Sequence, residues 1–263
     1  MNIRNLLPVI VICILLLAIG CKRQPSSVNV EQLHSSKGQK ILAPGLGTIG
    51  VIKDHEVFVY FLNESNKWIL DKVSQFQIPE KNQGIMGLGM GIIGVIDKGV
   101  VHFYYMDAEN QWSKDRDVVF DLPDKYKRIT SMRMPWEVGL IGIEDTNGVI
   151  SFYYLNENAQ WVKDETAAFV VPQGTKEYIM LGGMEIGIIT DNKLGIYQLN
   201  QQGKWEFWEE LVLLLPENYE AIITFEPGTI AVLESDKLMF YEIDTFNNSW
   251  IYDHTMDFSM SDI

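Results

Sequence analysis

The chain has 263 residues, of which 47% are hydrophobic and 21% charged, a composition that is typical of a folded globular protein and argues against disorder. Its 35 acidic and 21 basic residues give a formal charge of −14, which disfavours nucleic acid as a partner because an acidic surface repels phosphate. Both cysteines, Cys13 and Cys21, lie in the first 21 residues. The folded part is therefore expected to have no disulfide framework and no thiolate metal site.

The N-terminus has the pattern of a signal peptide. Arg4 precedes an apolar run over residues 6–19, which is too short to span a bilayer comfortably but suits a signal-peptide core. The run ends in LAIGC, which resembles the lipobox of bacterial lipoproteins, although Leu is commoner where Ala18 stands. The resemblance implies removal of residues 1–20 and acylation of Cys21. An ordinary secretory peptide or a short membrane anchor is the alternative.

The resemblance to lipoproteins also indicates where the protein resides. Residue 22 is Lys, not the Asp that commonly retains such proteins at the inner membrane, so we expect a lipid anchor in the outer membrane of a bacterial cell envelope. Residues 21–40 are polar and rich in Ser, which predicts a flexible tether. Alternatively, VNVEQL at residues 28–33 adds to the domain as an edge strand.

Five copies of one repeat follow from residue 41 onward. A Trp recurs at intervals of 44, 49, 44 and 45 residues, and three further markers keep phase with it. The Trp marker is Trp68, Trp112, Trp161, Trp205 and Trp250. The Tyr marker is Tyr60, Tyr104, Tyr153, Tyr197 and Tyr241. The Phe/Leu marker is Phe76, Phe120, Phe169, Leu213 and Phe258. A pair of small residues precedes them, as in Gly91 and Gly94.

Each copy divides into four short extended stretches separated by turn residues. In the second copy they are QGIMGLG, GIIGVID, VVHFYYMD and QWSKDRDVVFDL. Four-stranded units of about 44 residues predict an all-β fold, a five-bladed β-propeller, with an open β-solenoid as the alternative. We expect a single propeller domain over residues 41–263. Its blades are expected at about 41–81, 82–127, 128–176, 177–219 and 220–263, with neither terminus completing the other's sheet.

The repeats resemble those of propeller lectins of the five-bladed tachylectin type, and more loosely the six-bladed fucose-binding type. The shared features are blade length, repeat number and a polar hairpin before a Trp, as in YYLNENAQW. The resemblance covers residues 41–262 in architecture only, and none of the sugar-contacting residues of those lectins can be matched here.

No catalytic or metal-binding constellation emerges from the sequence, and we expect no cofactor. The histidines His34, His55, His102 and His254 have no partner at zinc-ligand spacing. The repeated acids Asp71, Asp115, Asp164 and Asp253 could ring a cation or a sugar, but a turn-capping role is favoured, and Trp208 interrupts the set. The repeated Tyr and Trp residues are expected in the core.

Functional residues are expected where one copy departs from the others. These candidates are Trp136, Trp208, Glu209 and His102. The leading hypothesis is a lipid-anchored, non-catalytic propeller that binds a protein or a glycan. A lectin is the first alternative, and a carbohydrate-active hydrolase with carboxylates in the central channel is the second.

Overall fold

A computed structural model describes residues 29–30, 33–34, 40–45, 47–107, 109–132 and 139–259. Throughout these ranges the chain forms strands and turns, and no helix occurs. Consequently no described segment is a helix with the length and apolar character needed to cross a membrane. The predicted signal peptide, Cys21 and Trp136 lie outside the described residues.

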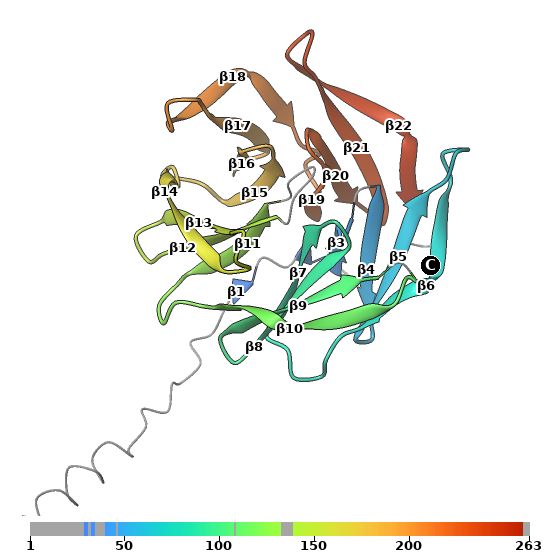
Figure 1. Cartoon of the computed structure of the whole chain (residues 1–263). Coiled ribbons are helices and arrows are strands. Elements are labelled where there is room, and N and C mark those ends of the chain that lie inside the picture. The colour runs from blue at the N-terminus through green and yellow to red at the C-terminus, as the bar shows by residue number, and fades with distance from the viewer. Residues whose placement is uncertain are drawn as a thin grey trace, which may run out of the picture.

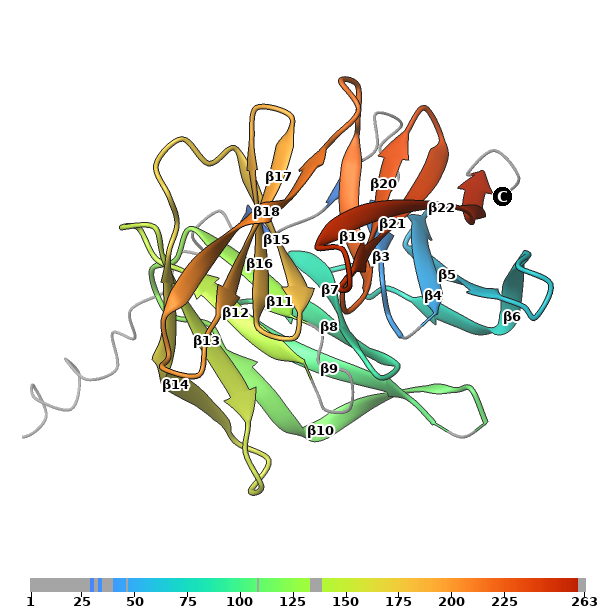
Figure 2. The ribbon, with the colours of Figure 1, turned by 90° about the horizontal axis from the view of Figure 1, so that it is seen from above.

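Five antiparallel sheets stand around a common axis, and the predicted five-bladed β-propeller is confirmed (Figures 1 and 2). Blade 1 contains β3 (Lys40–Leu42), β4 (Thr48–Lys53), β5 (Glu56–Leu62) and β6 (Trp68–Gln77). Blade 2 contains β7 (Gly84–Gly89), β8 (Ile92–Asp97), β9 (Val100–Met106) and β10 (Trp112–Asp121). Blade 3 contains β11 (Arg128–Met132), β12 (Leu140–Glu144), β13 (Val149–Leu155) and β14 (Trp161–Val170). Blade 4 contains β15 (Glu177–Gly182), β16 (Glu185–Thr190), β17 (Lys193–Leu199) and β18 (Trp205–Leu214). Blade 5 contains β19 (Ala221–Glu226), β20 (Thr229–Glu234), β21 (Lys237–Asp244) and β22 (Ser249–Ser259).

The blades are consecutive meanders, so alternate connections emerge at opposite ends of the strands. We call the end with the loops between blades and the turns between second and third strands the loop face. The opposite end, with the hairpins between third and fourth strands, is the hairpin face. At each hairpin an Asn or Asp side chain accepts backbone N–H bonds: Asn63 Oδ1, for example, accepts from Ser65 and Lys67 at 3.0 and 2.9 Å.

The three aromatic markers pack together at the junctions between blades. Tyr104 and Trp112 of blade 2 hold Phe76 of blade 1, with ring centroids 5.0 and 5.3 Å apart. Tyr153 and Trp161 of blade 3 hold Phe120 of blade 2 in the same way, at 5.0 and 5.7 Å. The repeat therefore encodes contacts between copies as well as within a copy.

The ring closes through the same contact. Trp68 of blade 1 lies 5.5 Å from the ring of Phe258 in blade 5, and its Nε1–H donates to the Met256 carbonyl at 2.8 Å. Trp112 and Trp205 donate equivalently to Ser74 O and Ala167 O of the preceding blades, at 2.9 and 3.2 Å. Because both chain ends of the propeller stay within their own sheets, side-chain packing closes the ring, not an exchanged strand.

The glycines in the second strands lie where neighbouring side chains leave no room for a Cβ atom. A Cβ on Gly94 would meet Met86 and Val101 side chains at 3.0 and 3.1 Å, and one on Gly187 would meet Leu194 at 2.6 Å. Near the axis, the hydroxyl of Ser131 in β11 donates to the Gly87 carbonyl of blade 2 at 2.8 Å. The inner strands thus touch from blade to blade.

Two short strands precede the propeller. β1 (Asn29–Val30) pairs parallel with β11, and β2 (Leu33–His34) pairs antiparallel with β3. The structure thus has strands within and just beyond residues 28–33, as in the alternative in which VNVEQL adds to the domain. Each strand lies beside the inner strand of its sheet, at the inner edge of that sheet.

Substituting Trp161 tests the packing of the markers. Its indole stacks on Phe103 of blade 2 with centroids 5.2 Å apart, so Trp161→Ala should lower the free energy of unfolding by about 3–5 kcal/mol. Phe246→Ala is the control, because Phe246 is 97% exposed and should leave stability unchanged. Urea unfolding of both variants measures the difference, and equal stabilities would contradict the packing role.

Candidate functional site

The residues singled out by departure from the repeat do not come together. His102 lies in β9 of blade 2, whereas Trp208 and Glu209 lie in β18 of blade 4. Trp208 packs partly buried against the blade 4 and 5 core, and Glu209 is exposed. His102 is half-buried; burial lowers its pKa and Lys114 adds to the effect, while Asp97 opposes it. These residues form no common site.

The repeated acids shape the outer strands. Asp164 Oδ1 accepts from the backbone N–H and the hydroxyl of Thr166 at 2.8 and 2.7 Å, and Asp253 does the same with Thr255 at 2.9 and 2.7 Å. Each acid stands at a register shift between the third and fourth strands. These bonds give the repeated Asp a turn-capping role within each outer strand.

A different pair of departures does meet, at the junction of blades 3 and 4. Tyr178 in β15 stands where the other inner strands have Ile, and Glu144 in β12 stands where the other second strands have Ile or Leu. The Tyr178 hydroxyl donates to Glu144 Oε2 at 3.1 Å, and Lys127 Nζ lies 2.6 Å from Oε1. Glu144 is only 1% exposed, so this carboxylate is held inside the interface and serves to fix its neighbours.

The first residues of the inner strands lie at the loop face, and three of the five are charged. In chain order they are Lys40, Gly84, Arg128, Glu177 and Ala221. The Arg128 guanidinium lies 4.4 Å above the Tyr178 ring, a cation–π contact between blades 3 and 4. Burial raises the pKa of Glu177, although the charge of Arg128 opposes the shift.

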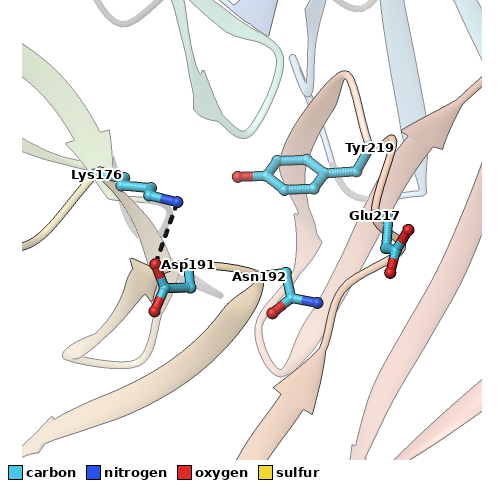
Figure 3. A pocket seen from close by; sticks show the side chains of 5 residues that line it. All are labelled: Lys176, Asp191, Asn192, Glu217 and Tyr219. Atoms are coloured by element: carbon cyan, nitrogen blue, oxygen red, sulfur yellow. Dashed lines mark ion pairs between the residues drawn. The ribbon is translucent and has the colours of Figure 1, made fainter.

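A pocket of about 470 Å³ opens next to these residues on the loop face. It is lined from three connections of blades 4 and 5 by Lys176, Asp191, Asn192, Glu217 and Tyr219 (Figure 3). The Lys176 ammonium lies 3.4 Å from Asp191 Oδ1, and the Tyr219 hydroxyl points toward this pair. Its volume falls within the range of small-molecule sites.

Local backbone bonds position the pocket side chains. Lys176 and Asn192 are tied into blade 4, since Lys176 N–H donates to Ile189 O at 2.9 Å and Asn192 O accepts from Leu215 N–H at 2.8 Å. The Tyr219 ring packs on the core between blades 4 and 5. Burial and the nearby charge of Glu177 raise the pKa of Tyr219, so its hydroxyl remains a hydrogen-bond donor. The pocket therefore offers donors, acceptors and both charge signs around one aromatic ring.

Phasing the five copies at every position singles out Glu144 and Tyr178, because the other four copies have Ile or Leu there. Arg128 and Glu177 carry no such signal, since Lys40 is charged at the same position. The pocket itself has no such signal, because its walls come from loops that meet only after the blades pack. Among the described residues, no group of three or more His, Cys, Asp or Glu side chains is arranged to hold a metal ion.

The fold defines a five-bladed β-propeller protein. The sequence matches no protein-family model and no curated protein. Solved structures with similar folds include the SapL1 lectin in complex with α-methyl fucoside, with 14% identity, a TM-score of 0.46 and coverage of 82% of this chain and 79% of that one. A protein of unknown function from Desulfotomaculum acetoxidans is 9% identical, with a TM-score of 0.42 and coverage of 84% and 71%. A putative 6-phosphogluconolactonase from Bacteroides uniformis is 10% identical, with a TM-score of 0.40 and coverage of 83% and 70%.

A double-mutant cycle tests the buried pair. Tyr178→Phe should destabilise the protein by about 1–3 kcal/mol, because Glu144 loses a donor while remaining buried. In a Glu144→Ile background, with the residue that other copies carry there, the acceptor is gone and the same change should cost about 0.5 kcal/mol or less. Denaturant unfolding of the four proteins gives the coupling. Equal costs in both backgrounds would show that the two groups do not interact.

The pH dependence of stability tests the environment of Glu177. Its pKa in the folded protein lies above the ordinary value of 4.5, so the folded state binds the proton more tightly, and the protein gains stability as the pH falls through the folded pKa. Glu177→Gln should therefore be more stable than the wild type at neutral pH, and this advantage should vanish near pH 4. Glu157→Gln, at an exposed hairpin tip, is the control. A constant difference across the pH range would contradict the shift.

Proposed function

We propose that this protein is a lipid-anchored binding module of the bacterial cell envelope, and that its propeller binds a small polar ligand in the pocket between blades 4 and 5. The observation that carries the proposal is the composition of this pocket. Lys176, Asp191, Asn192 and Glu217 surround the Tyr219 ring in a volume that suits a small molecule. The lipid anchor is inferred from LAIGC and Cys21.

The polar residues at the neighbouring junction of blades 3 and 4 support the proposal. Glu144 and Tyr178 bond across the junction of blades 3 and 4, and Arg128 lies over the Tyr178 ring at the same junction. Glu177 of blade 4 lies close enough to Tyr219 for its charge to raise the pKa of that pocket tyrosine. The other junctions have mostly aliphatic or small residues at these positions. An array of polar groups that occurs at one junction of the ring, next to the pocket, is what an asymmetric ligand site in a repeated fold requires.

A glycan is the second candidate for the ligand. The observation that favours it is the Tyr219 ring beside Asp191, Asn192 and Glu217, because sugar recognition combines stacking on an aromatic face with hydrogen bonds to amide and carboxylate groups. The hydrolase alternative needs carboxylates that face an open central channel. β1 and β2 lie along the inner edges of two blades, which leaves that chemistry less room.

Binding by the soluble Cys21→Ser protein tests the proposal. Glycan arrays and a panel of hydroxylated and zwitterionic small molecules should reveal a saturable ligand, with Cys21→Ser itself released from membranes. Tyr219→Ala and Asp191→Ala should each weaken binding at least about tenfold, equivalent to losing about 1.4 kcal/mol of binding free energy.

Tyr105→Ala is the matched control for this experiment. Tyr105 is an exposed tyrosine on blade 2, 44% accessible, and its loss should leave affinity unchanged. Binding that survives both pocket substitutions would place the ligand elsewhere. A Cys21→Ser protein that stays in the membrane fraction would contradict the lipid anchor.

A further inference from the structure

The direction of β1 fixes the face from which the chain enters the propeller. β11 runs away from the loop face, starting at Arg128, and β1 is parallel to it with Asn29 level with Arg128. β2 is antiparallel to β3, with His34 level with Lys40 at the start of that inner strand. The chain therefore comes in at the loop face, descends beside blade 3 and returns beside blade 1.

The same face holds the pocket. Lys176 precedes β15, Asp191 and Asn192 form the turn between β16 and β17, and Glu217 and Tyr219 precede β19. All three connections lie at the end of the strands where Asn29 enters, since inner strands start there and second strands end there. The entry point and the pocket thus share one surface.

The tether is too short to turn the domain over. Eight residues lead from Cys21 to Asn29, and eight residues reach at most about 29 Å. Four strands spaced by about 4.8 Å make a blade about 19 Å wide, and a six-residue inner strand is about 20 Å long. A path from the axis across the width of a blade and along its outer edge to the hairpin face is therefore about 39 Å, which is longer than the tether can reach.

We propose that the loop face is the membrane-facing surface of the protein, so that the pocket opens toward the lipid headgroups. This inference rests on the lipid attachment at Cys21 that we propose above. The hairpin face, with the exposed Phe246 at the tip between β21 and β22, then points away from the membrane.

The orientation restricts what the pocket can meet. The gap beneath the loop face is no deeper than about 29 Å at the axis. A folded chain of this protein's own length has a radius of gyration of about 18 Å and is roughly 47 Å across. The gap admits a lipid headgroup or a small solute and excludes a folded protein of that size.

Energy transfer to the membrane tests the orientation. The acylated protein is reconstituted in phosphatidylethanolamine–phosphatidylglycerol vesicles that contain an acceptor-labelled lipid, and protein that floats with the vesicles is measured. A donor is attached at Lys98→Cys, an exposed site on the loop face, or at Glu64→Cys, an exposed site on the hairpin face. Each introduced thiol can be labelled selectively, because Cys13 leaves with the signal peptide and the Cys21 sulfur carries lipid.

Donors at position 98 should be quenched at least about twofold more strongly than donors at position 64, which lie about 24 Å further away across a seven-residue strand. Equal quenching, or stronger quenching at position 64, would overturn the orientation. Inserting a Gly/Ser segment of about 30 residues after Arg23 should abolish the difference, because the domain could then rotate freely. A difference that persisted would overturn the tether as its cause.

Failure of the lipid anchor is separable from failure of the route. Protein that does not float with vesicles contradicts the proposed anchor. The route is then tested in the soluble Cys21→Ser background, where Asn29→Cys should form an oxidised crosslink with Arg128→Cys but not with Glu226→Cys, at the hairpin-face end of β19. The reverse preference, or no crosslink to position 128, would overturn the entry through the loop face.

Discussion

The structure depends on one contact that recurs at the junctions between blades: the Phe/Leu marker of a blade held by the Tyr and Trp of the next. Phe76 between Tyr104 and Trp112 and Phe169 between Tyr197 and Trp205 show the same geometry, with centroids 5.0–5.3 Å apart. Large aromatic side chains bury much apolar area in a junction only one side chain deep. Because Trp68 makes this contact with Phe258, the last blade meets the first without an exchanged strand.

The sequence predicted the ring because this contact requires the same residue types in each copy. A marker that keeps its type over five copies is constrained by packing, and the spacing of Trp68, Trp112 and their equivalents was enough to predict the blades. The candidate site was less accessible. Trp208 and Glu209 depart visibly from the pattern, yet they lie on an outer strand, whereas the pair that meets in the structure is Glu144 and Tyr178. A polar residue in an aliphatic position is a weak signal in one copy, and it gains meaning only when its partner in another blade is known.

The Glu144–Tyr178 bond is a poor device for stability alone. A buried carboxylate loses its hydration, and aliphatic residues at such positions are often as stabilising as the polar pair. The equivalent positions of the other blades show that Ile and Leu suit this fold. The polar pair also orients a side chain. It holds the Tyr178 ring beneath the Arg128 guanidinium at the loop face, next to the pocket. The free-energy cost of burying a carboxylate is therefore confined to the junction of blades 3 and 4, whose residues differ from those of the other junctions.

The N-terminal strands cover inner edges of two blades. The inner strand of each blade has one edge toward the axis, and the unpaired N–H and C=O groups of such an edge can pair with a further strand. β1 and β2 pair with parts of two such edges, at blades 3 and 1. β1 thereby brings the chain into the propeller beside blade 3, next to Arg128. The tether predicted for residues 21–40 is thereby shortened to the eight residues before Asn29. Pairing at the axis, not the composition of the tether, then determines which face the lipid anchor that we propose would turn toward a membrane.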